Sequence, residues 1–278
     1  FYTNYNTFAF MNGLTLKAIS TDIKNGFQVP PIEEFEKAIT DKTKAILVCN
    51  PGNPTGTLYS KESMLALGEI ARKHDLFLLS DEVYREFCYT DEPHFSAMNI
   101  PGLEQNVILI DSVSKRYNLC GARVGCIVSH NKDVMTAAMK FAQARLCPPV
   151  LGQYASIGAL DTPDEYFAAV KEEYIKRRDY MIEGLNKIEG VFTPLPMGAF
   201  YTIAELPVDD TENFARWMLE NFRIDNETTM VTPAASFYKT PGKGKNHARI
   251  AYVLEVEEMD KALKILEEGL KAYPGRTL

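Results

Sequence analysis

The sequence lacks the long apolar segments that membrane-spanning helices need. Its longest apolar runs, such as AILV, LFLL and VILI, are far shorter than the roughly 20 residues with which a helix crosses a bilayer. It also lacks an excess of basic residues, because 30 Lys and Arg stand against 37 Asp and Glu and leave a net charge of -7. We therefore expect no membrane and no nucleic-acid partner, and a small-molecule ligand instead.

Patterns for metals and disulfides are absent as well. The cysteines are odd in number and form no C-x-x-C pair, so we expect small buried hydrophobic residues in a reducing compartment, which favours the cytoplasm. The histidines show no metal-ligand spacing and no G-x-S-x-G partner, which predicts surface or satisfied core histidines and no metal site. These residues are Cys49, Cys88, Cys120, Cys126 and Cys147, and His74, His94, His130 and His247.

Common phosphate-binding glycine motifs and a secretory signal are also missing. GKGKN does not fit the Walker A frame and follows no apolar run, and no G-x-G-x-x-G opens a helix. The first residues, FYTNYNTFAF, contain no initiator Met, no basic region and no cleavage-site pattern. We expect no secretory signal, and we expect the sequence to lack its true beginning.

From Lys44 to Val128, short apolar runs alternate with polar or Gly-rich turns. The runs are KAILVC, DLFLLS, NVILID and RVGCIV. Runs without polar alternation are typical of strands covered on both faces. Between the first two, Ser60 can cap a helix whose apolar residues recur at helical spacing, which gives a βαβ unit. The predicted fold class is α/β, with a mostly parallel sheet flanked by helices.

After Asp133 the sequence changes to longer helical patterns. One stretch begins just beyond Pro163 and ends before Gly190, which predicts a helix that connects two domains. Beyond it, VFTPL, GAFYTIAEL, MVTPA and HARIAYVL are strand candidates, and two amphipathic helices accompany them. We expect a large domain over residues 1–165, and the connector with a smaller C-terminal α+β domain over residues 166–278.

Two polar segments directly follow predicted strands, at the sheet edge where ligands bind in open α/β folds. NPGNPTG is a rigid loop in which Asn53 is best placed to bind a ligand, although a plain turn capped by Asn53 is an equal alternative. In SDEVYREF, Asp81 and Tyr84 are three residues apart, so a turn would direct both to one point. The alternative there is a helix cap and a half-buried tyrosine.

A third segment, DSVSKRYNLCGARVG, follows the run VILI. Ser112 and Ser114 offer hydroxyls, and the Arg123 guanidinium suits bidentate contact with a phosphate. Lys115 offers an amine, whose attack on a carbonyl requires the neutral form that a nearby cation and desolvation favour. With Arg116, the stretch contains three cations, and it has no acidic residue after Asp111. A bound phosphate would therefore supply the missing negative charge. A solvated surface loop is the alternative.

Arg249 opens an otherwise apolar strand candidate, HARIAYVL. An arginine directed inward there costs desolvation energy unless an anion meets it. A substrate carboxylate and an internal Asp or Glu are both possible partners.

Taken in order, NPGNPTG, SDEVYREF, DSVSKRYNLCGARVG and ARIAYV resemble the motifs of the fold type I pyridoxal-phosphate enzymes, specifically the class I and II aminotransferases. The resemblance spans most of the chain and implies pyridoxal 5'-phosphate as cofactor, bound by the large domain. The resemblance implies that Lys115 is the catalytic lysine that bonds the cofactor and that Asp81 is the partner of the cofactor's pyridine nitrogen. It implies that Tyr84 and Asn53 bind the ring oxygen, and that the phosphate ligands are Ser112, Ser114 and Arg123. Arg249 with Asn53 is implied to bind the substrate carboxylate.

The implied reaction is transamination between an amino acid, with aspartate as one candidate, and a 2-oxo acid. Asp81 would keep the ring nitrogen protonated, Lys115 would move the α-proton, and Arg249 would orient the substrate. Two alternatives stay open: a lyase or decarboxylase of the same fold, and a non-catalytic fragment that keeps the fold alone.

Family members carry further parts before the position that matches Phe1. These are a Gly-rich loop for the cofactor phosphate and an aromatic residue that stacks on the cofactor ring, and neither is found here. We therefore expect an incomplete chain with weak cofactor binding and impaired turnover. The family also builds its site across a dimer interface, which implies a homodimer for the full-length protein and leaves dimerisation of this chain open.

Overall fold

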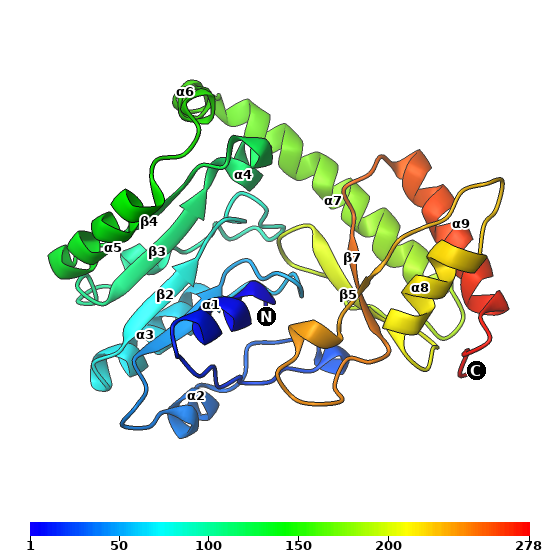
Figure 1. Cartoon of the computed structure of the whole chain (residues 1–278), viewed down its shortest axis with the longest axis horizontal. Helices are drawn as coiled ribbons and strands as arrows, with labels where there is room; N and C mark the ends of the chain where they lie inside the picture. The colour runs from blue at the N-terminus through cyan, green and yellow to red at the C-terminus, as the bar shows by residue number, and fades with distance from the viewer.

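The computed structural model describes all 278 residues and contains two β-sheets joined by one long helix (Figure 1). The first sheet has the strand order β1-β2-β3-β4, with the first three strands parallel and β4 antiparallel to β3. This confirms the predicted α/β class and the mostly parallel sheet. The strands are β1 (Ala45–Cys49), β2 (Phe77–Asp81), β3 (Val107–Ser112) and β4 (Gly125–Val128).

Helix α3 (Lys61–Lys73) connects β1 to β2 as a βαβ unit. The Ser60 side chain accepts a hydrogen bond from the Ser63 amide, 3.2 Å away, and so caps the helix as expected. Met64, Leu67 and Ala71 are fully buried and pack with Val48 and Leu78 of the sheet, among others, in one core cluster. The helical spacing in the sequence therefore identified the buried face correctly.

The edge strand β4 departs from the expectation of strands covered on both faces. All four of its residues are exposed. Helix α5 (Lys132–Arg145), which follows it in the chain, buries none of its own residues. An edge strand pairs on one side only, and no helix packs tightly over this one, so the prediction was wrong for β4.

The cysteine expectation was correct for part of the set. All five cysteines are free, Cys88 is buried and Cys49 is half-buried. Three are exposed, which contradicts the prediction, because they lie on β4, in a short 3-10 helix (Cys120–Ala122) and just before α6 (Val150–Ala159). These are Cys126, Cys120 and Cys147, respectively.

The long helix α7 (Asp164–Lys187) follows Pro163 and ends before Gly190, as the sequence predicted. It runs from the neighbourhood of α4 (Val113–Arg116) and α6 to the second sheet (Figure 1). The domain limits 1–165 and 166–278 remain a prediction. None of the helices combines the length and the apolar character needed to span a bilayer.

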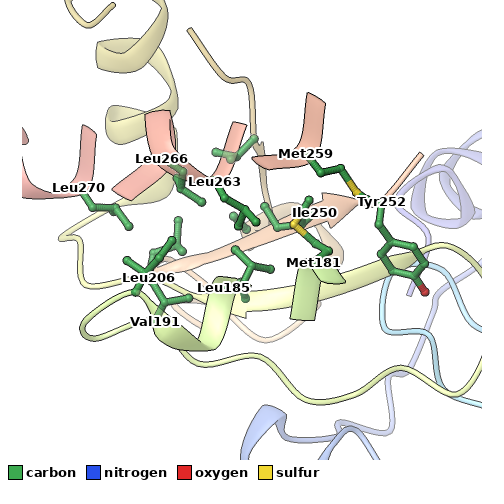
Figure 2. Close-up of a cluster of buried hydrophobic side chains, with 14 of the residues drawn as sticks. Met181, Leu185, Val191, Leu206, Ile250, Tyr252, Met259, Leu263, Leu266 and Leu270 are labelled. Atoms are coloured by element: carbon green, nitrogen blue, oxygen red, sulfur yellow. The ribbon is translucent and has the colours of Figure 1, made fainter. Parts of the chain in front are cut away.

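The second sheet is antiparallel, with the strand order β5-β7-β6. Its apolar side packs against α7 and α9, and Figure 2 shows Leu185 of α7 meeting Leu263 and Leu266 of α9 in this core. The predicted apolar face of α9 is confirmed, and Met218 of α8 is buried with it. The elements are β5 (Tyr201–Glu205), β6 (Thr232–Pro233), β7 (His247–Ala251), α8 (Thr211–Asn221) and α9 (Val256–Ala272).

The segment VFTPL, expected as a strand, forms only an isolated bridge between Phe192 and Glu205. Pro194 lies in this segment and Pro196 directly after it, and a proline cannot donate to a ladder. Two further helices, α1 (Asn4–Met11) and α2 (Ile32–Ala38), lie in the first part of the chain.

Candidate active site

The carboxyl ends of β1, β2 and β3 meet at one edge of the first sheet. Cys49 of β1 pairs with Asp81 of β2, and Asp81 pairs with Ile110 of β3. The Asn50 amide donates to the Asp81 carbonyl at 2.9 Å, which joins the first two loops directly. The three polar segments singled out in the sequence therefore leave the sheet side by side, as the strand pattern predicted.

Lys115 lies in α4, immediately after β3. Its Nζ atom is 5.9 Å from the centroid of the Tyr84 ring and 5.6 Å from that of the Phe200 ring. It lies within reach of no hydrogen-bond acceptor or carboxylate of the chain. The amine is thus held among aromatic faces and remains available to a ligand.

The two serines before Lys115 form one local network. Ser112 Oγ lies 2.8 Å from both Ser114 Oγ and the Val124 carbonyl oxygen, and it accepts from the Ser114 amide. This network holds the turn that carries Lys115. Arg123 is more remote, since it is exposed and donates to the Cys120 carbonyl at 2.8 Å. The phosphate-binding role of these residues stays a prediction.

Arg116 does not contribute the unbalanced charge that the sequence suggested. Its guanidinium lies 3.2 Å from carboxylate oxygens of both Asp111 and Glu86. Asp111 also pairs with Arg85 at 3.2 Å. The expectation that the charges of this stretch lack an acidic partner beyond Asp111 was wrong for Arg116, because Glu86 lies far from it in sequence and next to it in space.

The Asp81 carboxylate is half-buried and held from two sides. Oδ2 accepts a 2.6 Å hydrogen bond from the Tyr5 hydroxyl, and Oδ1 accepts a weak one of 3.4 Å from the Val83 amide. Burial raises the pKa of Asp81 above its ordinary value, and the Tyr5 hydrogen bond opposes part of that shift. Burial also raises the pKa of the neighbouring Cys49 thiol to about 12, so this cysteine stays protonated and is no nucleophile at neutral pH.

Tyr84 is buried, and its hydroxyl lies 3.4 Å from that of Tyr201. Burial raises the pKa of the Tyr84 hydroxyl, and Tyr201 adds to the shift. The phenol therefore remains protonated at neutral pH and can donate a hydrogen bond.

Arg249 of β7 reaches the loop after β1. It donates to Asn53 Oδ1 at 3.1 Å, and its guanidinium lies 4.6 Å from the Tyr201 ring centroid and 5.1 Å from that of Phe237. No carboxylate of the chain pairs with it, which excludes the internal Asp or Glu alternative. Its Nε atom is buried without an acceptor. A ligand carboxylate or phosphate would complete this set of donors.

Two residues near the site were missed by sequence reasoning. Tyr5 contacts Asp81 from 76 residues away and lies in no motif. Tyr201 begins β5, three residues after Gly198, within the strand candidate GAFYTIAEL, and no role in the site was predicted for it. Gly198 before the strand was the one available signal, since a Cβ there would lie 2.6 Å from Pro51 Cβ and 2.9 Å from the Phe87 carbonyl oxygen.

His94 meets the expectation of a satisfied core histidine only in part, because its Nδ1 atom is buried without a partner. Its Nε2 atom lies 2.9 Å from Glu82 Oε2, and Glu82 Oε1 also accepts from the Ser80 hydroxyl and the Ala97 amide. Burial alone would raise the pKa of Glu82, but the hydrogen bonds and charge of its partners bring it below its ordinary value. These hydrogen bonds of Glu82 fix the turn that follows Asp81.

The family model described as "Aminotransferase class I and II" matches residues 1–266. The chain belongs to this family. Among curated relatives, a putative aminotransferase of Bacillus subtilis, YugH, is 33% identical over 249 residues, which are 88% of this chain and 61% of the relative. An aspartate aminotransferase of Thermotoga maritima is 31% identical over 261 residues, 94% of this chain and 64% of that relative. The chain thus spans somewhat less than two thirds of the length of these family members.

Solved structures of the family have the same fold. An aspartate aminotransferase of Thermus thermophilus superposes with a TM-score of 0.85 at 27% identity, covering 97% of this chain and 68% of that one. An aromatic aminotransferase of Pyrococcus horikoshii gives 0.78 at 28% identity, covering 90% of this chain and 66% of that one. The recognition of the family from its motifs is confirmed.

The donors around Lys115 fit pyridoxal 5'-phosphate, the cofactor that the motifs imply. An aldehyde requires a primary amine, and the Lys115 amine is unpaired. A pyridinium nitrogen requires an anionic partner, which Asp81 offers, and a ring oxygen requires a donor, which Tyr84 offers. The unsatisfied Arg249 Nε adds a place for a substrate anion.

Proposed function

We propose that this chain carries the active site of a pyridoxal-phosphate-dependent aminotransferase, which transfers an amino group from an amino acid to a 2-oxo acid. Membership of the family supports the type of reaction. The observation that carries the proposal is the unpaired Lys115 amine, which lies beside the Tyr84 ring at the sheet edge where Asp81 also ends its strand.

Each side chain has a distinct task in this proposal. When bound, pyridoxal phosphate supplies an aldehyde for the amino group and a ring that withdraws electrons from the substrate carbon. Lys115 carries the proton to and from the substrate α-carbon. Asp81 holds a proton on the pyridine nitrogen, and Tyr84 donates to the ring oxygen. Ser112, Ser114 and Arg123 bind the phosphate.

Arg249 and Asn53 would bind the substrate α-carboxylate together. Their 3.1 Å hydrogen bond supports this, because it aims the guanidinium at the loop beside the cofactor position. A carboxylate fixed there orients the bonds of the α-carbon and favours proton loss over decarboxylation. Every amino acid has this group, so the donor is proposed from the relatives alone. Several are named aspartate aminotransferases, which makes aspartate the first candidate.

A homodimer and a cytoplasmic location also remain proposals. The first is supported by large apolar side chains left exposed on α5 and α6, such as Phe141 and Leu151. The second is supported by the exposed free cysteines, which suit a reducing compartment.

Borohydride trapping tests the proposal. The purified 278-residue chain is mixed with pyridoxal phosphate and reduced, and peptide mass spectrometry should locate the cofactor on Lys115. Lys115→Ala should lose the label, whereas Lys171→Ala on α7 should keep it. Labelling spread over surface lysines in both variants would contradict the proposal.

A second measurement separates transamination from lyase chemistry. Amino acids are added singly to the loaded protein, and the absorbance of the bound cofactor is followed. Conversion of its aldehyde to an amine without a 2-oxo acid present indicates transamination. Release of carbon dioxide or of the side chain instead would favour a decarboxylase or lyase.

A further inference from the structure

Tyr201 stands between the two ends of the candidate site. Its hydroxyl lies 3.4 Å from that of Tyr84, and its ring lies 4.6 Å from the guanidinium carbon of Arg249. Tyr201 therefore contacts both Tyr84, whose ring lies near the Lys115 amine, and Arg249, which is proposed to bind the substrate carboxylate.

We propose that Tyr201 is a positioning residue with two separable parts: its ring orients Arg249 for the substrate carboxylate, and its hydroxyl orients the Tyr84 phenol. This inference rests on the proposed function and adds a residue that none of the site motifs contains.

The ring part follows from how Arg249 is held. A partly buried guanidinium with a buried Nε normally requires a carboxylate, and Arg249 has none. The rings of Tyr201 and Phe237 attract the cation and fix its plane without neutralising it. An incoming carboxylate then meets a pre-oriented cation and displaces no competing anion. A carboxylate partner in the chain would have to be displaced first.

The hydroxyl part follows from the burial of Tyr84. The Tyr201 hydroxyl is the one polar group of the chain within hydrogen-bond reach of the Tyr84 hydroxyl. A distance of 3.4 Å is long for two hydroxyls, so the contact is weak but directional. The Tyr84 hydroxyl donates in this contact and the Tyr201 oxygen accepts, so Tyr201 fixes the direction of the Tyr84 O–H bond.

The backbone fixes Tyr201 relative to both loops of the site. The Gly198 amide donates to the Gly56 carbonyl, and the Ala199 amide donates to the Phe87 carbonyl, each at 2.9 Å. The segment before Tyr201 is thereby fastened to the loop that carries Asn53 and to the turn that carries Tyr84. These backbone bonds hold the segment independently of the Tyr201 side chain, which is only partly buried against the core, so substitutions there should keep the fold.

Two substitutions separate the two parts. Tyr201→Phe keeps the ring and removes the hydroxyl, while Tyr201→Leu removes both. Tyr180→Leu is the matched control, because Tyr180 of α7 is also partly buried against the same core and lies outside the site, and circular dichroism checks the fold of each variant. Binding of the dicarboxylate maleate to the cofactor-free chain is measured by calorimetry, and the pH dependence of the absorbance of Lys115-bound pyridoxal phosphate is measured separately.

We expect Tyr201→Leu to weaken maleate binding about tenfold, within the range of a cation–π contact. Tyr201→Phe should bind maleate as the unmodified chain does, yet shift the pH midpoint of the cofactor absorbance. Unchanged maleate affinity in Tyr201→Leu would overturn the ring part, and an unshifted midpoint in Tyr201→Phe would overturn the hydroxyl part. If the unmodified chain binds neither maleate nor the cofactor on Lys115, the proposed function fails as well.

Discussion

The Tyr5 hydroxyl donates a 2.6 Å hydrogen bond to Asp81 Oδ2, from a helix that precedes the whole first sheet in the chain. Asp81 ends a buried strand, and its carboxylate has one other, weaker donor. The phenol therefore fixes the direction of the carboxylate and opposes part of the rise in the pKa of Asp81 that burial causes.

Tyr5→Phe should lower the free energy of unfolding by about 1 kcal/mol and weaken pyridoxal-phosphate binding several-fold, because Asp81 loses its strongest donor. Chemical denaturation and an absorbance titration measure the two effects. Tyr180→Phe is a matched control, since it removes a 2.7 Å hydrogen bond to Asp260 at the surface. Equal cofactor affinities in the two variants would contradict a role for Tyr5.

Asp81→Asn should stabilise the cofactor-free chain at neutral pH. The pKa of Asp81 is raised in the fold, so its protonated form is favoured, and stability is lost as the pH rises through that pKa. Asparagine removes this loss and still accepts from Tyr5. Thermal unfolding should show a gain at pH 7 that shrinks toward pH 4. A gain independent of pH would contradict the assigned cause.

Gly198→Ala should destabilise the protein by about 1–3 kcal/mol, because the new methyl group meets Pro51 and the Phe87 carbonyl where two loops cross. Gly158→Ala on α6 has open space around it and should instead gain about 0.5–1 kcal/mol from helix propensity. Urea unfolding compares them. The close-approach explanation fails if both substitutions have the same sign.

His94→Ala should cost about 3 kcal/mol at neutral pH, because it leaves the buried Glu82 carboxylate with fewer donors. Burial then dominates and should raise the pKa of Glu82, so the cost should shrink at acidic pH, where the carboxyl is neutral. Urea unfolding at pH 7 and pH 4.5 tests this. His74→Ala, at a half-exposed position, should change stability by less than about 0.5 kcal/mol.

The sequence predicted the first sheet and three loops of the site because buried parallel strands have a distinctive pattern. Asp81, Tyr84 and Lys115 each follow such a strand, so the edge at which they meet could be inferred from chain order alone. The covered face of α9 was likewise readable from its helical spacing.

Other contacts depend on tertiary structure that no local pattern encodes. Tyr5 reaches Asp81 from a separate helix, and Arg116 is neutralised by Glu86 of a different turn. The contact between Tyr201 and Arg249 depends on the register of β5 with β7, in which Ile203 and not Tyr201 stands opposite Arg249. The exposure of β4 could not be predicted from the sequence, because its composition matches that of strands covered on both faces.

The hydrogen bond between Arg249 and Asn53 joins positions 196 residues apart. Chains are synthesised from the N-terminal end at about 5–20 residues per second, so roughly 10–40 s separate the two residues during translation. The half of the site that carries Asp81 and Lys115 is made first, and the arginine that would select a substrate arrives afterwards. During translation, Lys115 is therefore part of the nascent chain before Arg249, the residue proposed to bind the substrate carboxylate, has been added.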